Sequence, residues 1–397
     1  MNYLKSLVAL LLLTGVAFCN QVDYQGDDGE VANIYRSETL PEEPIDDLPD
    51  HYFEGYLQAL VDMHYHEYRV VVYYDEGIAY LANLPKNKLT SNSIISFVQD
   101  VPGVESVQIY EDSDKQIVRE RDHSNVRPQV SGIWFPQSTE LFQPLIASPR
   151  AILYSANYRR GGDVIGKDVI AISLGDDFPI YRWLEVLPWN GDLQFGIQAC
   201  IWSVFKMGVH VPGTNEISEL VNTDYYLGIP ITYAVNNWSF RFRIYHISCH
   251  LGDERLVNGT PIARVNPSFE AIDFFASYQA NSHLRLYVGP GFIMHSDGSF
   301  PMDRLYVQYG GEFRFWGTRM LKQKLYGTWL LGAHLQNWQY QNWGYDGNYI
   351  FGYEWSKLQG TGRKMRILLN GHNGYSQEGQ FSKRKDAYAG VVLAWGF

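Results

Sequence analysis

Residues 238–250, WSFRFRIYHISCH, divide into two chemically different sets when the stretch is read as a β-strand, whose side chains alternate between two faces. One face is apolar and then polar, in the order Phe240, Phe242, Ile244, His246, Ser248 and His250. The other face carries Arg241 and Arg243, which are too costly to expose to lipid and therefore indicate a polar lumen. The stretch predicts one strand of a transmembrane barrel, with its apolar side facing lipid.

The composition agrees with a membrane barrel. The chain has 397 residues, of which 15% are aromatic, with 29 Tyr and 11 Trp, and only 19% are charged. Aromatic girdles at the two membrane surfaces account for such a profile better than an ordinary soluble enzyme does. The net charge of −11 argues against a nucleic-acid partner.

From about residue 151 onward, alternating segments of about ten or more residues recur between turn-rich pieces. We predict twelve antiparallel strands, at 151–160, 168–183, 193–206, 223–235, 238–250, 265–279, 284–295, 303–316, 325–337, 347–358, 364–374 and 386–397. Short and long links alternate between them, as periplasmic turns and outer loops do in transmembrane barrels. The last strand ends in Phe397, which resembles the C-terminal signature of bacterial outer-membrane barrels. The expected fold is an all-β transmembrane barrel.

The chain before the barrel predicts four further parts. Residues 1–19 are typical of an export signal, with cleavage after Cys19 slightly favoured over lipidation of that cysteine. Residues 20–50 form an acidic, flexible lead-in. Residues 51–111 predict an α+β module in the order αββαβ, and 112–140 a linker to the barrel at 141–397. We expect this module to lie in the periplasm, and an even number of strands then gives the same assignment of short periplasmic turns and long outer loops.

Two segments of the module, DEGIAYLANLP and VPGVESV, resemble the small BON domain of exported bacterial proteins. That family is associated with periplasmic and lipid-surface attachment and has no catalytic residues. The resemblance therefore implies a binding or anchoring module with a periplasmic protein or lipid partner. A ferredoxin-like packing domain without a specific partner is about equally compatible with the pattern.

The barrel region from about residue 140 resembles a family of predicted outer-membrane proteins known as domain of unknown function 1207. The segments that carry this resemblance are FQPLIASPR, SLGDDFPIYRW, NTDYYLGIPITY, RIYHISCHLGDE, RVNPSFEAIDF and LRLYVGPGF. The resemblance implies a bacterial outer-membrane location and no particular activity.

The strand at 238–250 and the strand that follows it predict a polar group on the outer wall of the barrel. The first strand runs outward, so its polar residues lie at the outer-leaflet end. If the hairpin pairs symmetrically, His246 faces Glu270, Ser248 faces Ser268 and His250 faces Asn266. Polar residues also gather at any membrane interface, which is the simpler explanation of this group.

The outer-membrane phospholipase A and the lipid A 3-O-deacylase place His-x-Ser on the lipid-facing wall, and His246-Ile247-Ser248 resembles that motif. The resemblance implies a serine esterase in which His246 is the base, Ser248 the nucleophile and Glu270 the residue that orients the imidazole. In those enzymes the orienting residue follows the histidine more closely in sequence.

Polar residues around the outer loop, namely His250, Asp253, Glu254, Asn266 and Ser268, are candidates for binding substrate or a divalent cation such as calcium. The sequence defines no metal site and requires no cofactor. The predicted function is thus an outer-membrane barrel with outer-membrane lipid as its partner and lipid ester as its substrate. The alternative is a non-enzymatic channel or structural barrel with a periplasmic docking module.

Overall fold

The computed structural model describes residues 50–65, 67–110, 132–136, 139–209, 216–258, 265–320, 325–357 and 362–397. The predicted export signal at 1–19 lies outside these residues, and so does the lead-in at 20–50 apart from Asp50.

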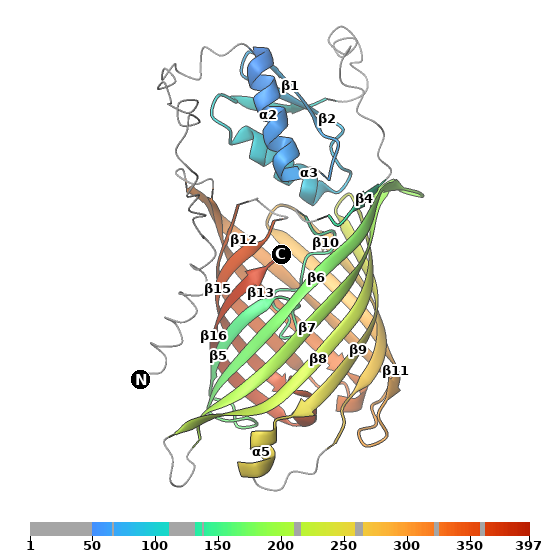
Figure 1. The fold of residues 1–397 in the computed structure, drawn as a ribbon, viewed down its shortest axis with the longest axis vertical. Helices are drawn as coiled ribbons and strands as arrows, with labels where there is room; N and C mark the ends of the chain where they lie inside the picture. The colour runs from blue at the N-terminus through green and yellow to red at the C-terminus, as the bar shows by residue number, and fades with distance from the viewer. Residues whose placement is uncertain are drawn as a thin grey trace, which may run out of the picture. The chain divides into compact units, whose positions relative to one another are not determined.

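Twelve antiparallel strands form a closed barrel, which confirms the predicted fold class (Figure 1). In chain order they are β5 (Tyr154–Arg160), β6 (Asp168–Val186), β7 (Gly191–Val209), β8 (Ile217–Val235), β9 (Trp238–Leu251), β10 (Phe269–Gln279), β11 (Leu284–Ser296), β12 (Leu305–Met320), β13 (Leu325–Trp338), β14 (Asp346–Ser356), β15 (Lys364–Tyr375) and β16 (Lys385–Gly396). Each strand pairs with the next along the chain, and β16 pairs with β5 to close the ring. The links alternate as expected, with 187–190, 236–237 and 280–283 at one end of the barrel and 252–268, 297–304 and 376–384 at the other.

The two sides of the barrel wall differ as the alternation in β9 predicts. Arg241 and Tyr245 are buried in the lumen, whereas Phe242 and Ile244 are exposed on the outer wall. Arg243 also faces inward, where it forms an ion pair with Asp273 of β10. A continuous outer band of exposed apolar side chains belongs to Leu227, Ile229, Ile231, Phe242, Ile244, Phe274, Leu286, Val288, Ile367, Leu369, Val391 and Leu393.

Exposed aromatic side chains border this apolar band at both ends of the barrel. At the end with the short links they are Trp183, Trp189, Trp238, Trp316 and Trp395. At the end with the long links they are Tyr225, Tyr309, Trp343, Tyr345 and Tyr349. Trp and Tyr with one apolar and one polar end are favoured at the level of lipid headgroups, so the two groups mark the membrane surfaces.

Residues 139–153 pass through the lumen of the barrel, and we call this stretch the plug (Figure 1). Arg285 donates hydrogen bonds to two plug carbonyls, 2.9 Å to that of Pro144 and 2.7 Å to that of Gln143. Glu312 accepts a hydrogen bond of 2.9 Å from the backbone of Ile146. These bonds satisfy the backbone of a segment that has no regular structure, so the plug can remain buried.

The plug is also held by its side chains. Phe142 packs against Phe275, and its ring lies 4.6 Å and 5.3 Å from the guanidinium carbons of Arg241 and Arg285. Both arginines are buried, and contacts of this kind are stronger when they are shielded from water. The lumen is therefore filled at this level by the chain itself.

The region expected to be a linker is not free where the structure describes it. Strand β4 (Gly132–Trp134) pairs antiparallel with β6, and its Trp134 ring makes an edge contact of 4.8 Å with that of Tyr181. Thr139 and Glu140 are buried at the start of the plug. In the described part of the predicted linker, residues 132–134 thus extend the barrel sheet, and residues 139 and 140 are buried where the plug begins.

The small domain has the predicted αββαβ order: α2 (Asp50–Tyr65), β1 (Val71–Asp75), β2 (Ile78–Ala82), α3 (Lys88–Gln99) and β3 (Ser106–Ile109). β1 and β2 are antiparallel, while β2 and β3 are parallel. The apolar sides of both helices cover the three-stranded sheet, through Phe53, Leu57 and Val61 of α2 and Ile94 and Phe97 of α3. None of the helices in the described ranges is long and apolar enough to cross a membrane.

Cys200 of β7 and Cys249 of β9, on strands that are not adjacent, are buried free thiols.

Glu378, in the link between β15 and β16, forms a buried ion pair of 2.7 Å with Arg159 of β5. Burial alone would raise its pKa, but Arg159, Arg150 and the Ser376 hydroxyl outweigh that effect and lower the pKa of Glu378 to about 2. A carboxylate whose pKa is depressed by folding stabilises the protein above the unfolded pKa of about 4.3, and this contribution is lost as the pH falls from there toward 2.

We therefore predict that Glu378→Gln lowers the free energy of unfolding by about 1–3 kcal/mol at pH 6, because Arg159 loses its charged partner. At pH 3 the difference between variant and wild type should shrink. Urea unfolding in detergent micelles at the two pH values checks this, and an equal loss at both would contradict it.

Candidate functional site

The predicted contact between His246 and Glu270 is present on the outer wall. The two residues are direct partners in the register of β9 and β10, and His246 Nδ1 lies 2.8 Å from Glu270 Oε1. About 45% of the His246 side chain and 40% of the Glu270 side chain are exposed, so this pair remains accessible from the membrane side. The carboxylate is placed to fix both the ring orientation and the tautomer of His246.

A second histidine, His295 of β11, also binds Glu270. Its Nδ1 lies 2.8 Å from Glu270 Oε2, so the carboxylate of β10 bridges imidazoles on the two strands that flank it, β9 and β11. Strict alternation from Leu284, Leu286 and Val288 would turn His295 into the lumen. A β-bulge shifts the register between Glu270 and Ala271 and leaves Met294 and His295 both exposed. Bulges commonly redirect a side chain in this way.

Ser248 lies on the same outer face as His246, two residues further toward the long links. Residues two apart on a strand are about 6.5 Å apart along it, within reach of one another through rotation of their side chains. Within the described part of the chain the Ser248 hydroxyl makes no hydrogen bond, so it is free to turn toward the imidazole. Catalytic hydrogen bonds commonly tighten only when substrate is bound.

The depth of this group follows from its neighbours on β8. His246 pairs with Leu227 of the apolar band, and Ser248 pairs with Tyr225 of the aromatic girdle. The boundary between acyl chains and headgroups therefore crosses the wall between His246 and Ser248, which is the level at which the ester bonds of lipids lie.

The expected pairs Ser248–Ser268 and His250–Asn266 do not form, because β10 begins only at Phe269. Pro267 has no backbone N–H and so cannot extend the ladder. Asn266 instead donates a hydrogen bond of 3.0 Å to Asp297 in the next long link, and Ser268 donates one of 2.6 Å to Asn266. Hydrogen bonds from Ser299 and Asn266 lower the pKa of Asp297. This cluster holds two long links together beside the site.

The other candidate residues lie apart from that cluster. Asp253 and Glu254 belong to the short helix α5 (Asp253–Asn258), where Glu254 accepts a hydrogen bond of 2.8 Å from the backbone of Leu220. His250 is exposed and makes an edge contact with the Tyr225 ring. Among the residues that the structure describes, no group of three or more His, Cys, Asp or Glu side chains is placed to hold a metal ion.

The arrangement can therefore supply an oriented imidazole and a nearby hydroxyl, both open to the membrane. Sequence reasoning found His246, Ser248 and Glu270 but not His295, because the bulge that exposes it has no glycine or proline to mark it. The sole sequence signal was a histidine at the end of a strand, FIMHS at 292–296.

Solved structures that are similar to this chain include hydrolases and channels. The outer-membrane phospholipase A from Escherichia coli is 13% identical with a TM-score of 0.41, over 61% of this chain and 92% of its own. The NanC porin is 11% identical with a TM-score of 0.31, over 62% of this chain and 99% of its own. The outer membrane channel DcaP of Acinetobacter baumannii is 9% identical with a TM-score of 0.25, over 62% and 94%. At these values the comparisons assign no activity.

No curated protein matches the sequence. The structure makes this chain a closed, twelve-stranded β-barrel with a band of exposed apolar side chains on its outer wall. A family model described as "protein of unknown function (DUF1207)" matches residues 69–397 and so includes most of the small domain, whereas we expected the likeness to begin near residue 140. The match extends over most of the chain, which therefore belongs to the DUF1207 family.

Proposed function

We propose that this protein is a serine esterase that hydrolyses acyl esters of outer-membrane lipids at the outer wall of its barrel. The observation that carries the proposal is the hydrogen bond between His246 and Glu270, on the lipid-facing side and beside Ser248. A carboxylate and a histidine exposed on the outer wall do not contribute to the apolar surface that stabilises the barrel in the membrane. Catalysis explains their presence at this depth.

In the proposed reaction, Glu270 stays ionised and accepts a hydrogen bond from Nδ1–H of His246, which leaves Nε2 without a proton as the free base. Nε2 removes the proton from the Ser248 hydroxyl as its oxygen attacks the ester carbonyl. The C–O bond of the ester then breaks, and His246 returns the proton to the departing alcohol. A water molecule, deprotonated by the same imidazole, cleaves the acyl-serine and releases the fatty acid.

The level of Ser248 favours a lipid substrate. The carbonyls of phospholipids and of acylated saccharide lipids lie between the acyl chains and the headgroups, at the level of Tyr225. A soluble ester would reach the same hydroxyl only after partitioning into that layer. The plug argues against the alternative function as an open channel, because it occupies the lumen with its own side chains.

For the small domain we propose a BON-like docking role in the periplasm, with a protein or lipid surface as its partner. The αββαβ order supports this proposal. The barrel topology supports the location, since an even number of strands returns the chain to its side of entry.

The test of the proposed esterase is release of fatty acid from mixed micelles of phospholipid or lipid A by the purified full chain, with and without calcium. A phosphonate that reacts with activated serines should label Ser248, located by mass spectrometry of the digested protein. Absence of both release and labelling from folded protein would refute the proposal.

Substitutions at Glu270 and His295 should have graded effects. Glu270→Gln keeps an acceptor for His246 but loses the charge that stabilises the imidazolium, so kcat should fall about 10²-fold. His295→Gln can still donate to Glu270, and kcat should change less than tenfold. The two kcat values on one micellar substrate check this, and the reverse order would show that His295 is the base.

A further inference from the structure

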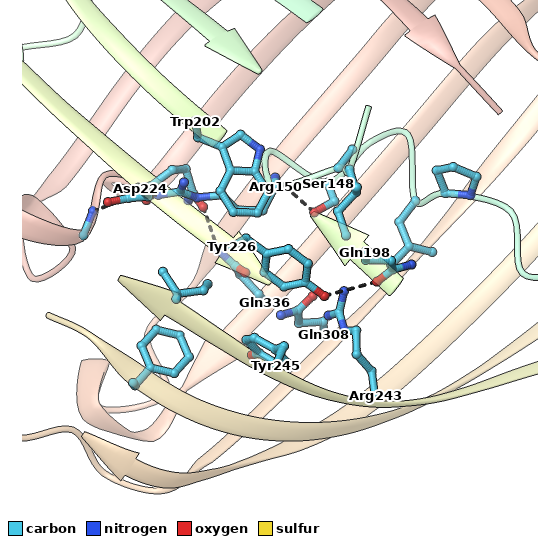
Figure 2. A pocket seen from close by; sticks show the side chains of 18 of the residues that line it. Ser148, Arg150, Gln198, Trp202, Asp224, Tyr226, Arg243, Tyr245, Gln308 and Gln336 are labelled. Atoms are coloured by element: carbon cyan, nitrogen blue, oxygen red, sulfur yellow. Dashed lines mark hydrogen bonds and ion pairs between the residues drawn. The ribbon is translucent and has the colours of Figure 1, made fainter. Parts of the chain in front are cut away.

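Strand β9 keeps a regular ladder with β8 beyond Ser248, so its side chains continue to alternate between the two faces of the wall. Arg243 and Tyr245 lie on the lumen side (Figure 2), whereas the even-numbered residues lie on the outer wall. His250 is two residues after Ser248 on that wall, as His246 is two residues before it. The nucleophile of the proposed reaction thus has an imidazole on each side, at a spacing of about 6.5 Å along the strand.

The two imidazoles differ in their partners. His246 Nδ1 lies 2.8 Å from Glu270 Oε1, and a carboxylate in that position stabilises the imidazolium that a general base becomes. The His250 side chain is exposed and makes neither a hydrogen bond nor an ion pair with another described residue. Its ring makes an edge contact with that of Tyr225, with 5.4 Å between the ring centres. His246 is therefore equipped to be the base, while a neutral His250 keeps one N–H that can donate to substrate.

The proposed reaction requires a hydrogen-bond donor beside Ser248. When the serine oxygen attacks the ester, the carbonyl oxygen acquires a negative charge, and donors placed at that oxygen commonly make the largest contribution to the rate. A neutral histidine can be such a donor, because its N–H polarises a carbonyl without first carrying a charge. The His250 ring can turn back along the wall toward Ser248, so that one oxygen atom lies between the two side chains.

The end of the ladder between β9 and β10 lies next to these two side chains. The last pair of that ladder is Ile247 with Phe269, and Pro267 cannot extend it. Ser248 and His250 are thus paired with β8 but with no residue of β10. An ester carbonyl can approach the wall from the side that β10 leaves open, between the serine hydroxyl and the His250 ring.

We propose that His250 is a second catalytic histidine, whose N–H donates a hydrogen bond to the carbonyl oxygen of the ester during hydrolysis; this inference rests on the proposed function. As the Ser248 oxygen bonds to the carbonyl carbon, the serine proton moves to His246 and the C=O electron pair moves onto the oxygen that His250 holds. When the C–O bond to the alcohol breaks, the C=O bond forms again and the alcohol takes the proton from His246. His250 transfers no proton in either step.

The experiment measures kcat and KM of the full chain on phospholipid micelles and on the p-nitrophenyl ester of the same fatty acid. His250→Ala should lower kcat about 10²-fold on both substrates and change KM less than about threefold, because the donor acts mainly on the transition state. The p-nitrophenyl alcohol departs without a proton, yet its carbonyl still acquires the charge. His250→Gln retains an N–H donor and should recover about tenfold of the loss. His51→Ala, an exposed histidine of the small domain, is the matched control and should keep wild-type rates.

Three results would overturn this inference while leaving the esterase in place, provided that Ser248→Ala is inactive. The first is an unchanged kcat in folded His250→Ala. The second is a loss on phospholipid alone, which would make His250 the acid that protonates the departing alcohol. The third is a larger loss in Tyr225→Phe than in His250→Ala, which would assign the donor to the tyrosine hydroxyl. A wild type that neither releases fatty acid nor reacts with the phosphonate would instead refute the esterase and this inference together.

Discussion

Ser248→Ala is expected to lower the kcat for lipid ester hydrolysis by at least about 10³-fold, the largest effect of any substitution considered. The oxygen of Ser248 forms the bond to the acyl group, and alanine offers no atom that can replace it. His246→Ala should cause a loss of similar size, because an unactivated hydroxyl is a weak nucleophile near neutral pH. Fatty acid release from phospholipid micelles gives both values.

The double variant provides a sharper result. Residues that act as one unit have effects that are far from additive, so Ser248→Ala/His246→Ala should be no slower than either single variant. Ser239→Ala, on the same strand near its other end, is the matched control and should retain wild-type rates. Retained activity in Ser248→Ala, in protein whose gel mobility shifts on heating as a folded barrel's does, would place catalysis elsewhere.

Alternation along the strands was sufficient to predict the barrel. Each strand separates two environments that stay constant along its length, so Arg241 and Phe242 are assigned to opposite faces by chemistry alone. The same rule predicted that His246 and Ser248 share the outer face. Symmetry about the long link then predicted the pair His246–Glu270, which the register of β9 and β10 confirms.

Features that depend on distant contacts could not be predicted in this way. The plug has no periodicity, and it is fixed by partners far along the chain, such as Asn348, which donates a hydrogen bond of 2.6 Å to the carbonyl of Ala147. The bulge that exposes His295 depends on how β11 pairs with β10. The pairing of β9 with the residues before Phe269, which symmetry predicted, does not form, because Pro267 cannot extend the ladder. Periodicity gives the side on which a residue lies only where the ladder is regular.

The wild-type barrel is expected to show no stable conductance steps in a planar bilayer, because the plug and its partners fill the lumen. Replacement of residues 141–149 by a Gly/Ser segment of equal length should open it. That change keeps the chain connected while it removes the Phe142 ring, its contacts with Arg241 and Arg285, and the apolar cluster around Ile146. The charged side chains that remain would line a polar, water-filled passage.

A smaller variant separates plug loss from general destabilisation. Phe142→Ala/Leu145→Ala removes two buried plug side chains, whereas Phe274→Ala/Leu286→Ala removes the same two types from the outer wall. Only the first variant should increase conductance or the swelling of liposomes in a small sugar, since only its side chains block the lumen. Equal leakage from both would mean that loosened barrels leak regardless of the plug, and steady conductance by the wild type would restore the channel as the better description of this protein.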